Sequence, residues 1–265
     1  MIMSECPKYI LEINDRFNRQ LRLFSAEDAN RIAFILGNPS AELLAGGVIN
    51  KPIKLYGNKI IKKLNKHGFS LGDLYNLPLV LRSPIAVFNN YDTDNNRSVL
   101  TELKAKKGNF LVSIELGKGT DAVFDIITST FGKDSSAVSK WISQNKMTYI
   151  NKEKAFGYLY HSALIAGAPD NESLIHIAKI IKDFQNPKIP KENFERISDI
   201  KLWIDNQGSY LMKCNIDGQP QLSVRLSNND ARDIKWAKVD KMEMAEKYFS
   251  QALSSKRSVG ISMKR

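Results

Sequence analysis

Four short apolar runs follow one another between Leu77 and Asn151, and this stretch constrains the fold more than any other part of the chain. Helical spacing of apolar residues precedes the runs and returns after them. Each run has the length of a strand and is rich in β-branched or aromatic residues. Short breaks rich in Asp, Asn, Lys or Gly separate the runs, which favours antiparallel pairing of neighbours. The runs are residues 85–90, 98–103, 110–116 and 123–131.

The pattern predicts an α+β fold in which N-terminal helices pack on one face of a four-stranded antiparallel meander. Residues 8–24 have the spacing of an amphipathic helix, and Ser25 with Asp28 resembles a capping pair for a second helix. The segment IKLY, residues 53–56, is expected to be extended. Further helical spacing is expected over residues 26–36, 58–66, 70–81, 138–151, 152–165 and 174–184.

A Pro-containing run, NPKIPKEN, gives the clearest linker signal in the chain. We therefore predict a domain at residues 1–185 with its core at 77–151, and a linker at 186–194. Three alternating runs and an amphipathic helix then predict a small module of three β-strands plus one helix at 195–255. A basic tail, residues 256–265, follows.

Composition narrows the class of protein. The chain has 265 residues, of which 43% are hydrophobic, and no apolar run approaches the roughly 18 residues that a membrane span needs. Charges interrupt the N-terminus before a secretory apolar core can form, so no signal peptide is expected. Cys6 and Cys214 are too few for a disulfide framework or a metal cluster. We expect a bacterial cytoplasmic protein without a membrane association, with delivery into another cell as the alternative.

The formal net charge is +11, and its distribution is uneven. Residues 51–100 carry eight basic and three acidic side chains, and residues 251–265 carry four basic and no acidic ones. Such clusters suit a polyanion, with nucleic acid as the first candidate. The alternative for the lysines between Lys59 and Lys66 is an ordinary solvated helix face.

The order of short motifs in the central stretch resembles the C-terminal domain of phage MuF proteins and its relatives in polyvalent proteins of phages and Bacteroides-type conjugative elements. The resemblance extends upstream through residues 17–21, 36–40 and 66–74, and so covers more than half of the chain. The residues that carry it are Leu77, Pro78, Ser83, Pro84, Ala86, Val87, Phe88, Thr101, Glu102, Leu103, Lys107, Asn109, Phe110, Ile127, Ser129, Phe131, Lys133, Trp141, Ile142, Tyr149, Ile150, Asn151 and Lys152.

The resemblance implies a fold group that includes barnase, EndoU, colicin-type tRNases and RelE, and a nuclease that cleaves RNA. The C-terminal part of the chain resembles a small module of mobilisation and topoisomerase-linked proteins from the same conjugative elements. That second resemblance rests on Lys213, Asn215, Ile216, Asp217, Gly218, Gln221, Leu226, Ser227, Asp230, Ala245, Tyr248, Phe249 and Leu253.

Metal-free RNA cleavage needs a base, an acid and a group that stabilises the charged phosphorane. We assign candidate catalytic roles to Ser129, Lys133, Glu102 and His67. Ser129 and Glu102 lie in the matched motifs, and Lys133 ends the same run as Ser129. The alternatives are a strand serine that faces a helix, a solvent-facing Glu102, and a His67 that interacts with a helix C-terminus. Candidate nucleic-acid contacts are Arg82, Lys104, Thr128, Thr130, Lys62 and Lys63, with both threonines expected on the face opposite Ser129.

No cofactor or metal site is expected. Asp92, Asp94 and Asn96 mimic the start of a calcium loop, but Arg97 and Leu103 replace its glycine and its last carboxylate. The segment GKGT at residues 117–120 lacks the spacing of a phosphate loop.

The leading hypothesis is a metal-independent endoribonuclease of toxin or effector type, encoded on a mobile element, with RNA or another nucleic acid as partner. One rival is a catalytically inactive protein of the same fold that binds nucleic acid or a protein partner. A third hypothesis is a structural or immunity-like protein that binds an acidic partner. A toxin would also imply a cognate immunity protein.

Overall fold

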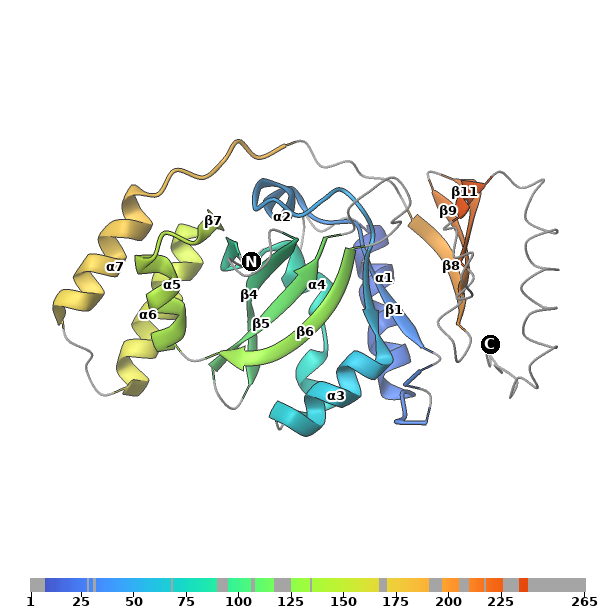
Figure 1. Ribbon diagram of the computed structural model, residues 1–265, viewed down its shortest axis with the longest axis horizontal. Coiled ribbons are helices and arrows are strands. Elements are labelled where there is room, and N and C mark those ends of the chain that lie inside the picture. Colours follow the sequence, from blue (N-terminus) through green and yellow to red (C-terminus); the bar gives the residue numbers. More distant parts are fainter. Residues whose placement is uncertain are drawn as a thin grey trace.

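The computed structural model describes residues 8–27, 29–30, 32–67, 69–89, 95–105, 108–116, 125–133, 135–166, 171–190, 197–204, 210–216, 218–225 and 234–237. It contains a seven-stranded sheet with helices on both faces and a separate four-stranded sheet (Figure 1). Within these residues no helix is long and apolar enough to cross a bilayer.

The seven-stranded sheet has the strand order β1-β2-β6-β5-β4-β3-β7. Its middle is the predicted meander, because β3 to β6 pair with their chain neighbours in antiparallel fashion, and this prediction is confirmed. Strand β2 joins β6 in parallel, and β7 joins the outer edge of β3. The strands are β1 (Ala33–Gly37), β2 (Ile53–Tyr56), β3 (Ala86–Asn89), β4 (Asn96–Ala105), β5 (Gly108–Glu115), β6 (Asp125–Lys133) and β7 (Met147–Ile150).

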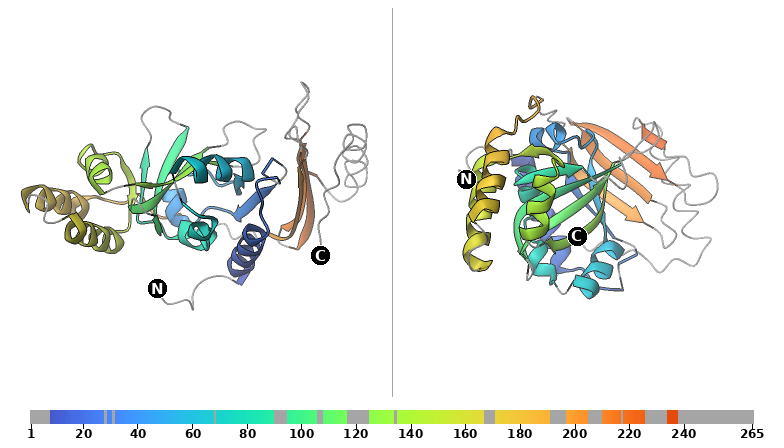
Figure 2. Two further views of the ribbon diagram at one scale, coloured as in Figure 1. Left: turned by 90° about the horizontal axis from the view of Figure 1, so that it is seen from below. Right: turned by 60° about the vertical axis from the view of Figure 1, so that its left-hand side comes forward.

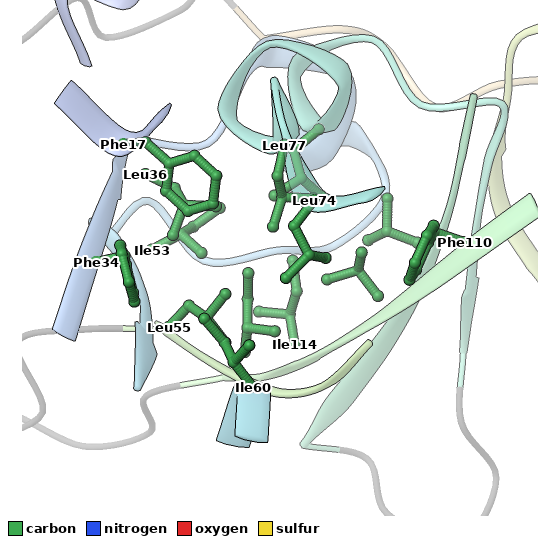
Figure 3. Packing of buried hydrophobic residues seen from close by; sticks show 14 of the residues in the cluster. Phe17, Phe34, Leu36, Ile53, Leu55, Ile60, Leu74, Leu77, Phe110 and Ile114 are labelled. Atoms are coloured by element: carbon green, nitrogen blue, oxygen red, sulfur yellow. The ribbon is translucent and has the colours of Figure 1, made fainter. Parts of the chain in front are cut away.

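The N-terminal helices cover one face of this sheet, which we call the first face. Phe110 and Ile114 of β5 point into a core shared with these helices (Figure 3). Val112, which lies between them at the alternate position of the strand, belongs to the same core. Phe17 and Phe34 meet edge to face in the same core, with ring centroids 5.4 Å apart. The elements on this side are α1 (Lys8–Arg22), α2 (Ala41–Ala45), α3 (Gly57–His67), the 3-10 helix η2 (Leu71–Leu74) and α4 (Leu77–Arg82).

A second core lies on the opposite face, which we call the second face. Phe88, Leu100 and Leu111 contact a group of three helices there, and Figure 2 shows these helices together on one side of the molecule. Our prediction of helices on a single face is therefore incomplete, since strands with continuous apolar runs bury both of their faces. The helices are α5 (Ser135–Ser143), α6 (Lys152–Ala166) and α7 (Asn171–Asp183).

Three local predictions are wrong. The helix expected at residues 26–36 is replaced by β1, whose five residues are all buried. The helical spacing at residues 138–151 ends early, and Met147–Ile150 form β7, an edge partner of β3. The helix expected at residues 70–81 is interrupted at Asn76, whose φ of 65° is left-handed, so η2 and α4 form instead.

The smaller sheet has the order β11-β10-β9-β8 and consists of antiparallel neighbours. It confirms the three predicted strands and adds a fourth. The predicted helix at 239–253 and the basic tail lie outside the described residues. Residues 184–190 before this sheet form neither helix nor strand; a domain boundary at 186–194 stays a prediction. The strands are β8 (Ile197–Ile204), β9 (Tyr210–Ile216), β10 (Gln219–Arg225) and β11 (Ile234–Ala237).

Candidate functional site

A β-bulge interrupts the pairing of β4 with β5. Leu100 lies opposite Leu111, and the next paired residues are Lys104 and Asn109. Three residues of β4, Thr101 to Leu103, therefore face the single residue Phe110 of β5. Bulges of this kind redirect side chains and are frequent beside functional sites. The bulge carries Glu102, one of the residues proposed from the sequence.

Buried side chains fix the shape of this bulge. The Thr101 hydroxyl donates to the carbonyl of Phe110 at 3.0 Å, and Asn109 Nδ2 donates to the carbonyl of Thr101 at 2.8 Å. Thr101 is 0% exposed and Asn109 is 3% exposed. Lys104 Nζ completes the set by donating to Asn109 Oδ1 at 2.7 Å. Two matched motif residues, Thr101 and Asn109, thus hold in place the backbone that presents Glu102.

Glu102 meets a lysine that the sequence analysis did not select. Lys154 Nζ donates to Glu102 Oε2 at 2.5 Å and to the carbonyl of Ser83 at 2.8 Å. The lysine side chain is 17% exposed, whereas that of Glu102 is 49% exposed. The carboxylate is therefore oriented by a half-buried ammonium and still open to solvent.

Helix α6 places Lys154 at this position. The Lys154 N–H donates to Asn151 Oδ1 at 3.1 Å, so Asn151 caps the helix and Lys154 lies in its first turn. A cation there opposes the helix dipole. The sequence gives no sign of this role, because Lys152 lies in the same first turn and the partner of Lys154 comes from a distant strand. Arg82 ends α4 one residue before Ser83, so it belongs to the same region of the chain.

Strand register locates the proposed residues of β6. Position 133 pairs with Asn109, which itself pairs with Lys104, so Lys133 and Lys104 lie on one row across three strands. Ser129 pairs with Ser113, which pairs with Ser98. This serine row lies four residues away along β6, or about 13 Å. The backbone therefore groups Lys133 with the bulge and separates Ser129 from it.

The two candidate threonines flank Ser129. Thr130 pairs with Val112, a residue of the first-face core, whereas Ser129 pairs with Ser113 in the alternate position. Thr128 lies at a register shift between β5 and β6. The register therefore places positions 129 and 130 in successive pairs with β5, while the shift leaves Thr128 outside simple alternation; the faces of the three side chains stay a prediction.

The structure does not bring His67 together with Glu102. His67 is the last residue of α3, whose Ile60 is buried in the first-face core. Lys154, the partner of Glu102, belongs to α6 on the second face. The sheet therefore separates the helix that ends at His67 from the Glu102–Lys154 pair.

Helix α3 also carries Lys62 and Lys63, together with Lys59 and Lys66. Partial burial, followed by the nearby ammoniums of Lys66, Lys62 and Lys59, lowers the pKa of Lys63. The helix contains no acidic residue. In the described part of the chain, no cluster of three or more His, Cys, Asp or Glu side chains could hold a metal ion.

Residues 58–156 match the family model of the phage MuF C-terminal domain. The matched segment runs from the second residue of α3 to the first turns of α6. It therefore includes the α3 lysines, the bulge with Glu102, and Lys154. No curated protein and no solved structure matches the chain.

Proposed function

We propose that the chain is a metal-independent endoribonuclease of toxin or effector type from a phage or a related mobile element. One observation carries this proposal: the Glu102–Lys154 pair on a side-chain-locked bulge, with further cations beside it. Lys104 lies two residues after Glu102 on β4 and pairs with Asn109 of β5. Asn109 in turn pairs with Lys133 of β6, so both lysines lie on the same row of the sheet. The match to a phage domain over the segment that holds these residues supports the genetic setting.

The reaction class follows from the groups available. RNA can be cleaved when its 2′-hydroxyl attacks the adjacent phosphorus, which gives a 2′,3′-cyclic phosphate and a free 5′-hydroxyl. Glu102 is the candidate base for the 2′ proton, because its carboxylate is exposed and accepts hydrogen bonds. Lys104 and Lys133 are the candidates that stabilise the phosphorane and protonate the leaving 5′ oxygen. Lys154 is a positioning residue that orients Glu102.

The test is incubation of the purified chain with tRNA and total RNA in the presence of EDTA, followed by mapping of the RNA ends. Discrete cuts that end in cyclic phosphate, lost in Glu102→Gln, support the assignment. Glu153→Gln is the matched control, since Glu153 is an exposed carboxylate one residue before Lys154. Cleavage that is unchanged in Glu102→Gln would move the reaction centre elsewhere.

A second candidate is a protein that binds nucleic acid without cleaving it. The four lysines of α3 favour this candidate, as does the separation of His67 from Glu102. Intact RNA in the assay above, together with binding that weakens with salt, would select it. In either case we assign the small C-terminal sheet to an accessory role in a mobile element. A toxin would also require an immunity partner in the producing cell.

A further inference from the structure

Helix α3 presents a face made only of lysines, which we call the lysine face: Lys59, Lys62, Lys63 and Lys66. The spacing of three and four residues brings these side chains onto one side of the helix. Ile60 is fully buried, Ile61 and Leu64 on the far side of the helix are partly buried against the first-face core, and Lys62 and Lys66 are exposed. The helix is therefore anchored to the sheet through its apolar side and offers the lysines to solvent.

The lysines repel one another without compensation from their own helix. Lys63 has its pKa lowered by burial and by the three other ammoniums, and α3 contains no carboxylate. Among the described residues, no ion pair to these four lysines is found. A like-charged face of this kind is unfavourable for an isolated helix, and a polyanion that binds it removes the repulsion.

The lysine face lies at the end of the sheet that carries the bulge. Helix α3 runs along β6 on the first face (Figure 1). Just after the helix, Phe69 packs edge to face on Phe110 with centroids 5.1 Å apart. Phe110 is the residue opposite the bulge, and its carbonyl accepts the Thr101 hydrogen bond. The C-terminal end of α3 and Glu102 are thus on opposite faces of the same end of the sheet.

Positive charge continues around this end. Lys104 lies where β4 reaches the β4–β5 hairpin. From Lys59 to Lys66 the helix axis covers about 10 Å. A chain of several nucleotides is needed to contact the helix and also reach Glu102 on the other face.

We propose that the lysine face of α3 binds the phosphates of an RNA chain that passes around the end of the sheet to Glu102. The substrate class is then RNA of many nucleotides, and short oligonucleotides engage only the bulge. This proposal rests on the proposed function for its location of the reaction centre. Binding at the lysine face can be measured without cleavage.

The experiment compares two triple variants with equal loss of charge. Lys59→Gln/Lys62→Gln/Lys66→Gln alters the lysine face. Its control, Lys140→Gln/Lys179→Gln/Lys188→Gln, alters exposed lysines of α5, α7 and the segment after α7. Binding is measured by fluorescence anisotropy on a labelled 2′-O-methyl RNA of about 30 nucleotides, which cannot be cleaved through its 2′ oxygens. Cleavage is measured in parallel on tRNA and on a tetranucleotide.

We expect the lysine-face variant to bind the long RNA about tenfold more weakly and the control to bind like the parent chain. The slope of log affinity against log salt should fall by about 2, since each single-strand phosphate contact contributes about 0.7. Cleavage of tRNA should fall while cleavage of the tetranucleotide is unchanged. Circular dichroism confirms that the variants are folded.

Equal binding by both triple variants would overturn the inference and leave the proposed function standing. Competition by polyglutamate as strong as that by RNA would also overturn it, because the face would then bind acidic proteins equally well. Lysine-dependent binding by a chain that cleaves neither substrate would support the lysine face as an RNA surface and refute the proposed nuclease.

Discussion

Glu102 Oε2 accepts a hydrogen bond from Lys154 Nζ at 2.5 Å, although the two residues lie 52 positions apart in the chain. The contact joins a bulge in the sheet to the first turn of a helix on the second face. Lys154 also donates to the carbonyl of Ser83, so three segments of the chain meet at one ammonium. Because Glu102 is half exposed, the pair contributes more to the orientation of the carboxylate than to the stability of the fold.

Glu102→Gln should lower the rate of RNA cleavage and leave the free energy of unfolding almost unchanged. The amide has nearly the shape of the carboxylate but is a very weak base, so we expect RNA cleavage to fall by about 10²- to 10⁴-fold. The free energy of unfolding should change by less than about 1 kcal/mol, since the ion pair is partly exposed. Urea unfolding and end-mapped cleavage measure the two effects. A large loss of stability with cleavage retained would make Glu102 structural.

Asn109→Asp should destabilise the bulge, because it removes one hydrogen-bond donor, the Asn109 side-chain N–H. The substitution keeps an acceptor for Lys104 but replaces the N–H that reaches the carbonyl of Thr101 with an oxygen. At a site that is 3% exposed, the unsatisfied carbonyl and the facing carboxylate should cost about 1–3 kcal/mol in the free energy of unfolding. Urea titration gives this value. Ser136→Asp, at an exposed site on α5, is the control for added charge.

The meander was predictable because its four runs are consecutive and separated by short turns, so each strand pairs with its chain neighbour. Strands β1 and β7 were missed for the converse reason. All residues of β1 are buried, which removes the alternation that distinguishes a strand from a buried helix. Strand β7 pairs with β3 across about sixty residues, and a four-residue run carries no sign of so distant a partner.

The candidate site was predictable only in part. Glu102 could be proposed from its motif, and Lys133 pairs at the row of Lys104 as a neighbour of the bulge. Lys154 was missed because its partner comes from another element, and hydrogen bonds between side chains leave no local pattern. Trp141, which the motifs also include, packs edge to face on Phe88 with ring centroids 5.4 Å apart, at the margin of the second-face core.

Gly46→Ala should destabilise the protein, and Gly157→Ala should not. A Cβ at position 46 would lie 2.7 Å from Val87 Cβ, and a β-branched strand residue cannot move aside without displacing β3. We expect a loss of about 1–3 kcal/mol in the free energy of unfolding. A Cβ at position 157 meets nothing within 4 Å on helix α6, so alanine should add about 0.5–1 kcal/mol there. Thermal unfolding of both variants distinguishes these signs. Equal effects would show that α2 does not pack closely on β3.

Lys63→Met should change how stability depends on pH. Burial, followed by the ammoniums of Lys66, Lys62 and Lys59, lowers the pKa of Lys63 in the folded chain. Between this lowered pKa and the ordinary pKa of lysine, the unfolded chain binds more protons than the folded chain. The free energy of unfolding contributed by this group therefore rises with pH across that window.

Methionine at position 63 removes the titrating ammonium and its repulsion by the three other lysines. The difference in the free energy of unfolding between Lys63→Met and the parent chain should be largest near neutral pH and should shrink as the pH rises through the window. Added salt at neutral pH should also reduce it, since salt screens charges near the surface, with a Debye length of about 10 Å at about 0.1 M. Urea titrations at neutral and alkaline pH measure the difference. A difference that is constant across pH and salt would mean that Lys63 affects folding through packing alone, because only the repulsion among ammoniums depends on protonation and on screening.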